Sequence, residues 1–128
     1  MNKEEDFTQI SFELEEAGLI WQPAFGDEIV VRKEPVRISV LVDSAGLTPE
    51  ELRDVYIWRP SVEQMILQVE VRQAILKHSG LELSPTAIKY LTILDTHYGK
   101  IEARANSFRD SIGLGLKDLL LISSSPIH

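Results

Sequence analysis

The 128-residue chain contains no cysteine, which excludes disulfide bonds, thiolate zinc sites and cysteine nucleophiles. Histidine is scarce as well. The chain has three, His78, His97 and His128, and none lies at the spacing of a known zinc motif. We therefore expect no metal site and no cofactor.

Positive charge is also in short supply. Lys and Arg number 13 against 20 Asp and Glu, which gives a formal net charge of −7. Attraction to a phosphate backbone is a sum over cationic contacts, so this balance disfavours DNA and RNA as partners. An acidic surface suits a basic protein partner instead.

Long hydrophobic runs are absent too. The longest aliphatic cluster, residues 119–122, is far shorter than a membrane span. Residues 1–6 are acidic and polar, whereas a signal peptide has a basic start followed by an apolar run. We therefore expect a cytoplasmic protein that does not bind membranes.

The length and an apolar fraction of 44% predict one globular domain over residues 1–128. The acidic segment 1–6 and the tail 123–128 are expected to be mobile, as chain ends often are.

The first half of the chain predicts a helix and a hairpin. Residues 7–17 carry an apolar stripe at helical spacing that ends at Gly18, although alternate residues are also apolar, as in a half-buried strand. The helix is favoured. Residues 28–32 and 36–42 are rich in Val and Ile and predict two strands, with Val36, Ile38, Val40 and Val42 on one side of the second.

Two helix starts are predicted in the middle of the chain. Thr48 and Pro49 are typical of a helix start, here of one or two turns, after which residues 54–58 should be extended. Ser61 with Gln64 forms a capping-box pattern, which predicts a helix to about His78 with Gly80 just beyond its end.

The most regular feature is a heptad-like spacing of apolar residues between positions 87 and 112. It predicts a helix over 85–112, or two helices broken at Gly99, which packs lengthwise against helix 62–78 or against a second copy of the chain. Gly113 and Gly115 should then interrupt the pattern. The predicted interface residues are Leu91, Leu94, Tyr98, Ile101, Phe108 and Ile112.

These elements together predict an α+β fold. A small antiparallel sheet from the N-terminal half should be backed by two to four helices from the C-terminal half.

The two tryptophans occur in similar contexts, each preceded by isoleucine and followed by proline two positions later. Trp21 and Trp58 would both end extended segments and could face one cleft, with Arg59 supplying a charge for an anion. The alternative, which is favoured, is that both rings are part of the core.

His97 is the residue best suited to move a proton near neutral pH. It lies beside Asp95 and Tyr98, but on a helix these side chains would point in different directions. The favoured interpretation is a solvated helix flank.

No motif in the chain identifies a reaction, and we expect no catalytic activity. The predicted function is that of a protein-interaction or regulatory module that forms a homodimer through helix 85–112. The alternative is a small-molecule-binding protein or small enzyme with a pocket formed by Trp21, Trp58, Arg59 and His97.

Overall fold

A computed structural model describes residues 3–124, with side chains from Phe7 onward. The chain divides into two compact units, residues 1–61 and 62–128, and each unit is described on its own. That residues 1–128 form a single domain stays a prediction. Two segments were expected to be mobile. Of these, residues 1–2 and 125–128 lie outside the described residues. Residues 3–6 belong to the first helix of the chain, and residues 123–124 belong to the last.

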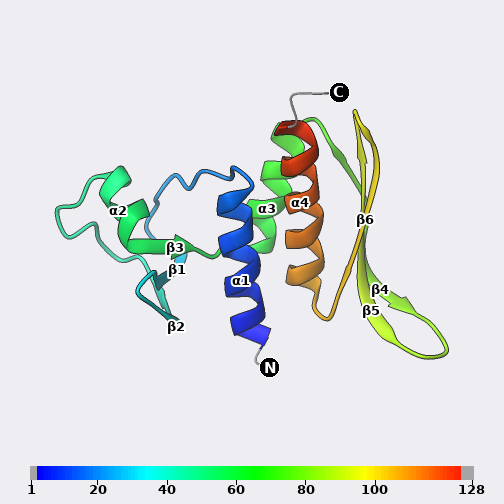
Figure 1. Cartoon of the computed structure of the whole chain (residues 1–128), viewed down its shortest axis with the longest axis horizontal. Helices are drawn as coiled ribbons and strands as arrows, with labels where there is room; N and C mark the ends of the chain where they lie inside the picture. The colour runs from blue at the N-terminus through cyan, green and yellow to red at the C-terminus, as the bar shows by residue number, and fades with distance from the viewer. Residues whose placement is uncertain (1–2, 125–128) are drawn as a thin grey trace. The chain divides into compact units, whose positions relative to one another are not determined.

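The first unit contains two helices and a three-stranded antiparallel sheet in the order β2-β1-β3 (Figure 1). Its elements are α1 (Lys3–Glu16), β1 (Glu28–Val31), β2 (Glu34–Val40), α2 (Pro49–Val55) and β3 (Tyr56–Trp58). The predicted helix over 7–17 and the predicted hairpin are therefore confirmed.

The two faces of this sheet carry different buried residues. Ile29 and Trp58, which are paired across β1 and β3, lie on the face that holds the buried cluster of Trp21, Leu41 and Leu52. Helix α1 lies against β3. Buried Val30 and its partner Ile57 occupy the face opposite that cluster, because successive residues of a strand alternate between faces.

Helix α2 begins as the sequence predicts. The Thr48 side chain accepts a hydrogen bond from the Glu51 backbone, and the Glu51 carboxylate accepts one from the Thr48 backbone. This second bond lowers the pKa of Glu51, because it favours the charged carboxylate. The helix then passes directly into β3, so only residues 56–58 of the predicted extended segment are a strand.

The second unit is an antiparallel three-stranded sheet in the order β4-β5-β6, with two helices against it (Figure 1). Its elements are α3 (Val62–Val71), β4 (Ile75–Leu83), β5 (Ile88–Thr96), β6 (Gly99–Ala105) and α4 (Phe108–Ser124). The α+β class is confirmed. None of the helices in residues 3–124 combines the length and the apolar character that crossing a bilayer requires.

The predicted helix over 85–112 is wrong. Residues 88–96 and 99–105 form two strands, joined by the two-residue turn His97–Tyr98, and Gly99, which follows this turn, has a φ of 120°. The apolar residues at heptad spacing are distributed over β5, the turn, β6 and the start of α4. Strand-forming residues such as Ile88, Tyr90 and Thr92 lie between them, and their preference for a pleated surface prevails over the helical spacing.

The helix predicted over 61–78 is too long. α3 ends at Val71, and Gln73 then takes a left-handed conformation with a φ of 61°. Gly80, expected just after a helix end, lies within β4.

The two glycines expected to interrupt a helix instead lie inside α4. A Cβ at Gly115 would be 3.4 Å from Thr92 Cγ2 and 3.6 Å from Leu94 Cδ1, both on β5. The glycine therefore lets the helix backbone approach the sheet closely. Next to this contact, the Thr92 hydroxyl lies 2.9 Å from the hydroxyls of both Ser79 and Ser111.

Replacing Gly115 tests this close approach. Gly115→Leu should lower the free energy of unfolding by about 1–3 kcal/mol, because its extra atoms have no space against β5. Gly115→Ala should be tolerated, since its Cβ would make ordinary contacts, and should gain up to about 1 kcal/mol in helix propensity. Urea unfolding followed by circular dichroism measures both. Equal effects of the two variants would contradict the packing described.

Candidate functional site

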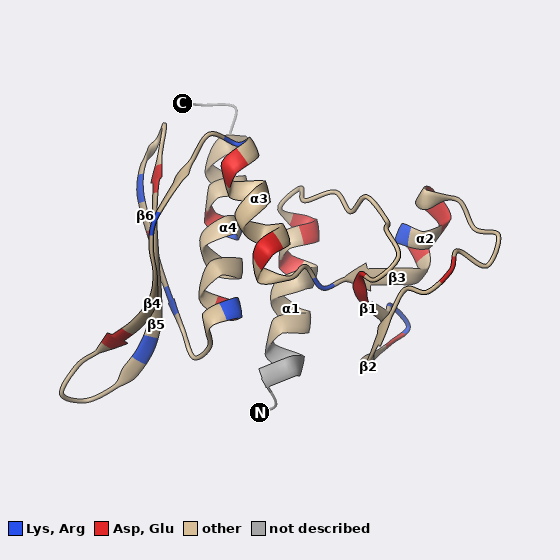
Figure 2. Ribbon diagram, turned by 180° about the vertical axis from the view of Figure 1, so that it is seen from behind, with Lys and Arg blue, Asp and Glu red and all other residues tan. Residues whose placement is uncertain are grey.

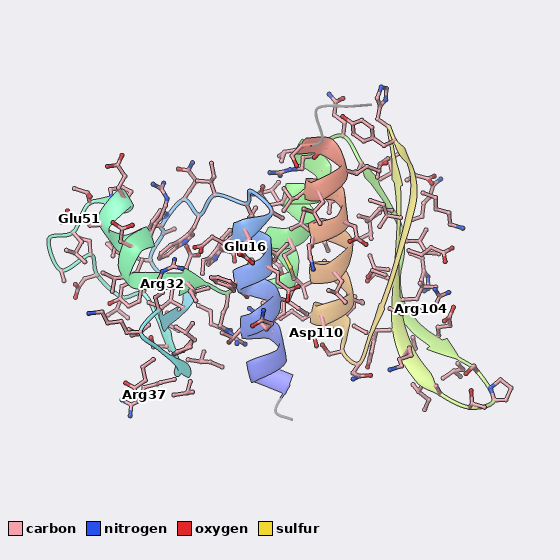
Figure 3. The ribbon with its side chains drawn as sticks, viewed as in Figure 1. Glu16, Arg32, Arg37, Glu51, Arg104 and Asp110 are labelled. Atoms are coloured by element: carbon pink, nitrogen blue, oxygen red, sulfur yellow. The ribbon has the colours of Figure 1, made fainter. Side chains whose placement is uncertain are left out.

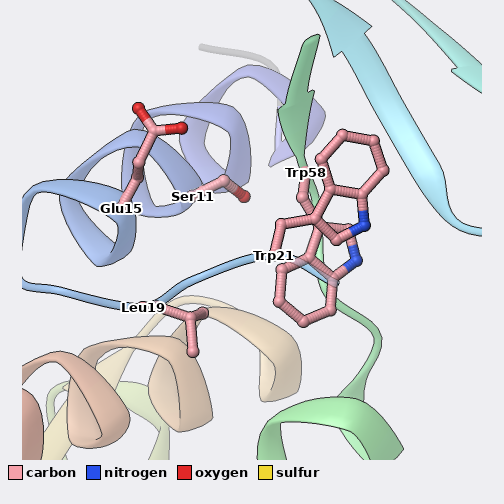
Figure 4. Close-up of a pocket in the computed structure, with 5 residues that line it drawn as sticks. All are labelled: Ser11, Glu15, Leu19, Trp21 and Trp58. Atoms are coloured by element: carbon pink, nitrogen blue, oxygen red, sulfur yellow. The ribbon is translucent and has the colours of Figure 1, made fainter. Parts of the chain in front are cut away.

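The structure brings together two of the predicted site residues, Trp21 and Trp58. Both belong to the first unit, where Trp58 packs against the buried cluster that contains Trp21. Their rings line a small pocket together with Ser11, Glu15 and Leu19 (Figure 4). Two of the four residues that the sequence places in a pocket therefore line one, without Arg59 or His97.

The Trp21 ring is held by hydrogen bonds at its polar edge. Its Nε1 donates to Asp27 Oδ2 at 2.8 Å, and the same oxygen accepts the Ala24 backbone N–H at 3.0 Å. Arg53 Nε also donates to the Trp21 backbone carbonyl at 2.6 Å. These bonds fix Trp21 as part of the core, which is the interpretation that the sequence favoured.

The Trp58 ring lacks such a partner. Its Nε1 is buried, and no acceptor bonds it among the described residues. A buried donor without an acceptor costs about 1–3 kcal/mol relative to a paired one. Among the side chains that the structure describes, it is the one buried nitrogen or oxygen without a hydrogen-bond partner.

The pocket is small. Its free volume is about 10 Å³, close to the space that one water molecule occupies. Small-molecule sites usually enclose about 300–1,000 Å³. In this conformation the pocket has room for a water but not for a metabolite.

Glu15, at the rim of the pocket, is held by Arg32. The guanidinium of Arg32 donates to both carboxylate oxygens, at 2.7 and 2.8 Å, and one of its nitrogens also reaches the Arg53 and Tyr56 carbonyls. The hydrogen bond that Arg32 donates to Glu15 raises the pKa of Arg32. Helix α1 is thereby tied to the start of β3.

Arg59 lies apart from the pocket. It follows Trp58 on an extended segment, and its side chain points to the opposite face of the sheet, as strand alternation requires. There Nε donates to Glu28 Oε1 at 2.6 Å, Nη1 donates to the Thr8 hydroxyl, and the guanidinium stacks 5.4 Å from the centre of the Phe7 ring. Only 2% of the residue is exposed, so its charge is engaged by Glu28 rather than available to an anion.

His97, the fourth predicted site residue, belongs to the second unit. It is exposed in the turn between β5 and β6, with its ring edge-on to Tyr98 at 5.9 Å between centres. Nearby Asp95 pairs with Lys77 at 3.4 Å. No group of three or more potential metal ligands occurs in the part of the chain that the structure describes.

The predicted interface residues do not form one seam. Leu91, Leu94, Ile101 and Ile112 are buried within the second unit, whereas Tyr98 and Phe108 are partly exposed. Because no helix spans 85–112, self-association through a helical seam over these residues is ruled out.

The face of the second sheet away from α4 is polar. Arg104 projects from it and donates to Glu82 on β4 at 2.7 Å (Figure 3). Further pairs join Lys100 to Glu102 and Lys77 to Asp95. Figure 2 shows positive and negative residues along these strands. The bond from Arg104 lowers the pKa of Glu82, as expected for a charged cross-strand pair.

Two exposed apolar surfaces are the features that the sequence analysis missed. We call the first the β2 stripe: exposed Val36 and Val40 and half-buried Ile38 on β2, together with exposed Val42, which follows the strand. We call the second the hairpin patch, formed by Leu81, Leu83, Ile88, Tyr90 and Phe108. For the β2 stripe, alternation in a strand marked which residues share a face but not whether anything covers that face. The hairpin patch was missed because residues 85–112 were predicted as a helix.

Comparisons with protein-family models, with characterised proteins and with solved structures find no match to this chain.

The two tryptophans make a matched pair for testing the unpaired donor. Trp21→Phe and Trp58→Phe remove equivalent atoms, but only the first breaks a hydrogen bond, the one to Asp27. We expect Trp21→Phe to cost about 1–3 kcal/mol more in unfolding free energy than Trp58→Phe. Urea unfolding of both variants measures the difference, and an equal cost would show that Trp58 has an acceptor.

Arg59 should contribute strongly to stability. Arg59→Ala removes a buried cation and leaves Thr8 and the partly exposed Glu28 without its hydrogen bonds, so we expect a loss of about 1.5–3 kcal/mol. The control is Lys77→Ala, which breaks an ion pair whose side chains are about half exposed and should cost about 0–1 kcal/mol. Similar small losses in both variants would contradict a structural role for Arg59.

Proposed function

We propose that this chain is a non-catalytic protein-interaction module, and that it binds its partner by adding an extended strand to the free edge of β2. The observation that carries the proposal is that β2 ends its sheet and that none of its seven residues is buried. The partner is a strand with apolar side chains on one face.

The side chains of β2 support this proposal. Val36 is 70% exposed and Val40 52%, and Val42 continues the row at 77%. An apolar row on an edge strand exposes both side chains and backbone groups, and proteins normally avoid this arrangement unless something pairs with it.

The backbone of β2 supports it as well. An edge strand has a row of N–H and C=O groups that no neighbouring strand in its sheet satisfies. Strand addition satisfies these groups by main-chain hydrogen bonds, while side-chain contacts along the row select the partner. The β2 stripe offers both elements on the same residues.

The alternative predicted from the sequence, a small-molecule site at the tryptophans, is supported by the unpaired Trp58 donor. Against it stand the small volume of the pocket and the engagement of Arg59 by Glu28 and Thr8. The interaction proposal therefore has the stronger support. A cytoplasmic location and the exclusion of nucleic acid as a partner remain predictions that accompany it.

A synthetic strand tests the proposal directly. The probe is a fluorescein-labelled peptide of alternating Thr and Val, titrated with the full chain while fluorescence anisotropy is measured. We expect saturable binding, weakened about tenfold or more by Val40→Lys, because a charge on the edge opposes strand pairing.

Two control variants locate the binding. Leu83→Lys places the same charge in the hairpin patch at a residue that is 72% exposed, and Ile20→Lys places it elsewhere in the first unit. Both should bind the peptide as the unmodified chain does. If Leu83→Lys abolishes binding and Val40→Lys does not, the docking surface is the hairpin patch and the proposal fails.

A further inference from the structure

We infer that the strand that β2 accepts is β2 of a second copy of this chain, paired antiparallel with Ile38 on the two-fold axis. The inference rests on the proposed function and names its partner. It would join the two sheets of the first units into one six-stranded sheet.

The first support is the direction of the backbone groups. Arg59 N donates to the Glu28 carbonyl, so Glu28 points its backbone toward β3. Glu28 pairs with Val40, and in an antiparallel ladder a residue bonded to one neighbour is not bonded to the other. Val40 therefore directs its own N–H and C=O away from β1, to the open edge.

Neighbouring bonds agree with this assignment. Leu41 N donates to the Asp27 carbonyl at 2.9 Å, so Leu41 points toward β1, as the residue next to Val40 must. Ile38, two positions before Val40 and opposite Val30, has the same direction as Val40. Ile38 and Val40, whose side chains belong to the β2 stripe, thus have backbone groups that face the open edge.

The second support is the symmetry of the sequence about Ile38. The five residues from Val36 to Val40 read Val-Arg-Ile-Ser-Val, with an apolar residue at the centre and at both ends. An antiparallel pair centred on Ile38 sets Ile38 opposite Ile38 and Val36 opposite Val40. It sets Arg37 opposite Ser39, so the two arginines are not directly opposed, as they would be in a pair centred on Arg37.

The β4 edge of the second sheet lacks this symmetry. Ser84 N donates to the Ala87 carbonyl, so the outward-facing residues of β4 are Ser79, Leu81 and Leu83. A pair centred on Leu81 would set each Leu83 against Ser79. The β2 edge is therefore the better match for a second copy.

The length of the pairing is limited. Glu34 pairs with Val31 and Ile38 with Val30, so residues 35–37 have no partner on β1. β2 ends at Val40, so the segment that pairs symmetrically about Ile38 is limited to residues 36–40. A short ladder closed by a two-fold axis gives a dimer rather than an extended assembly.

Cysteine cross-linking tests the register, because the chain has no cysteine of its own. Opposed residues of an antiparallel pair have Cα atoms about 4.5–5.5 Å apart, within the range of about 4.4–6.8 Å that a disulfide bridges. Ile38→Cys should therefore form a disulfide-linked dimer in a glutathione redox buffer, visible on a non-reducing gel.

Matched variants distinguish this register from random collision. Ser39→Cys, exposed on the same strand, lies opposite Arg37 in the proposed pair and should cross-link about tenfold less than Ile38→Cys. A mixture of Val36→Cys and Val40→Cys chains should form a mixed dimer in excess of either homodimer.

The outcomes separate the two proposals. Cross-linking of Ile38→Cys no faster than that of Ser39→Cys would overturn the second copy as the partner. If the Thr-Val peptide still binds and Val40→Lys still blocks it, strand addition at β2 stands with a different partner. Loss of both the cross-link and the peptide binding would overturn both.

Discussion

The first unit depends on the buried guanidinium of Arg59. From the end of β3 it bonds Glu28 on β1, and it contacts Thr8 and the Phe7 ring on α1. One side chain therefore links the helix to two strands of the sheet. Trp58, the residue before Arg59, must then face the opposite side of the sheet, because successive strand residues alternate. The position of the Trp pocket therefore follows from where Arg59 is anchored.

This arrangement also leaves β2 as the free member of its sheet. The contacts of Arg59 join β1, β3 and α1 and do not include β2. The Trp21 cluster lies on the opposite face of the sheet. The side chains of Ile38 and Val40 lie on the face opposite the Trp21 cluster, because Val40 pairs with Glu28 and Ile38 with Val30. The apolar side chains of the stripe are thus exposed on a sheet whose other strands are well anchored.

Much of the first unit could be predicted from local patterns. The stripe from Phe7 to Ala17 favours a helix over a strand, and the alternation after Val36 and the cap at Thr48 each indicate one element, which the structure contains. The second unit could not. Residues 88–105 satisfy a heptad spacing and a strand preference at once, and only the turn at Gly99, whose left-handed φ suits a hairpin, decides between them. The direction of Arg59 depends on α1 and β1, which no local pattern contains.

The row of hydroxyls beneath α4 has a fixed direction. Ser111 Oγ donates its single hydrogen to the Phe108 carbonyl at 2.9 Å, so toward Thr92 it can only accept. Thr92 must then donate to Ser111 and accept from Ser79, which orients every proton from the edge strand toward the helix. Such a polarised chain strengthens each of its bonds. A valine at position 92 would interrupt it, whereas a serine would preserve its direction.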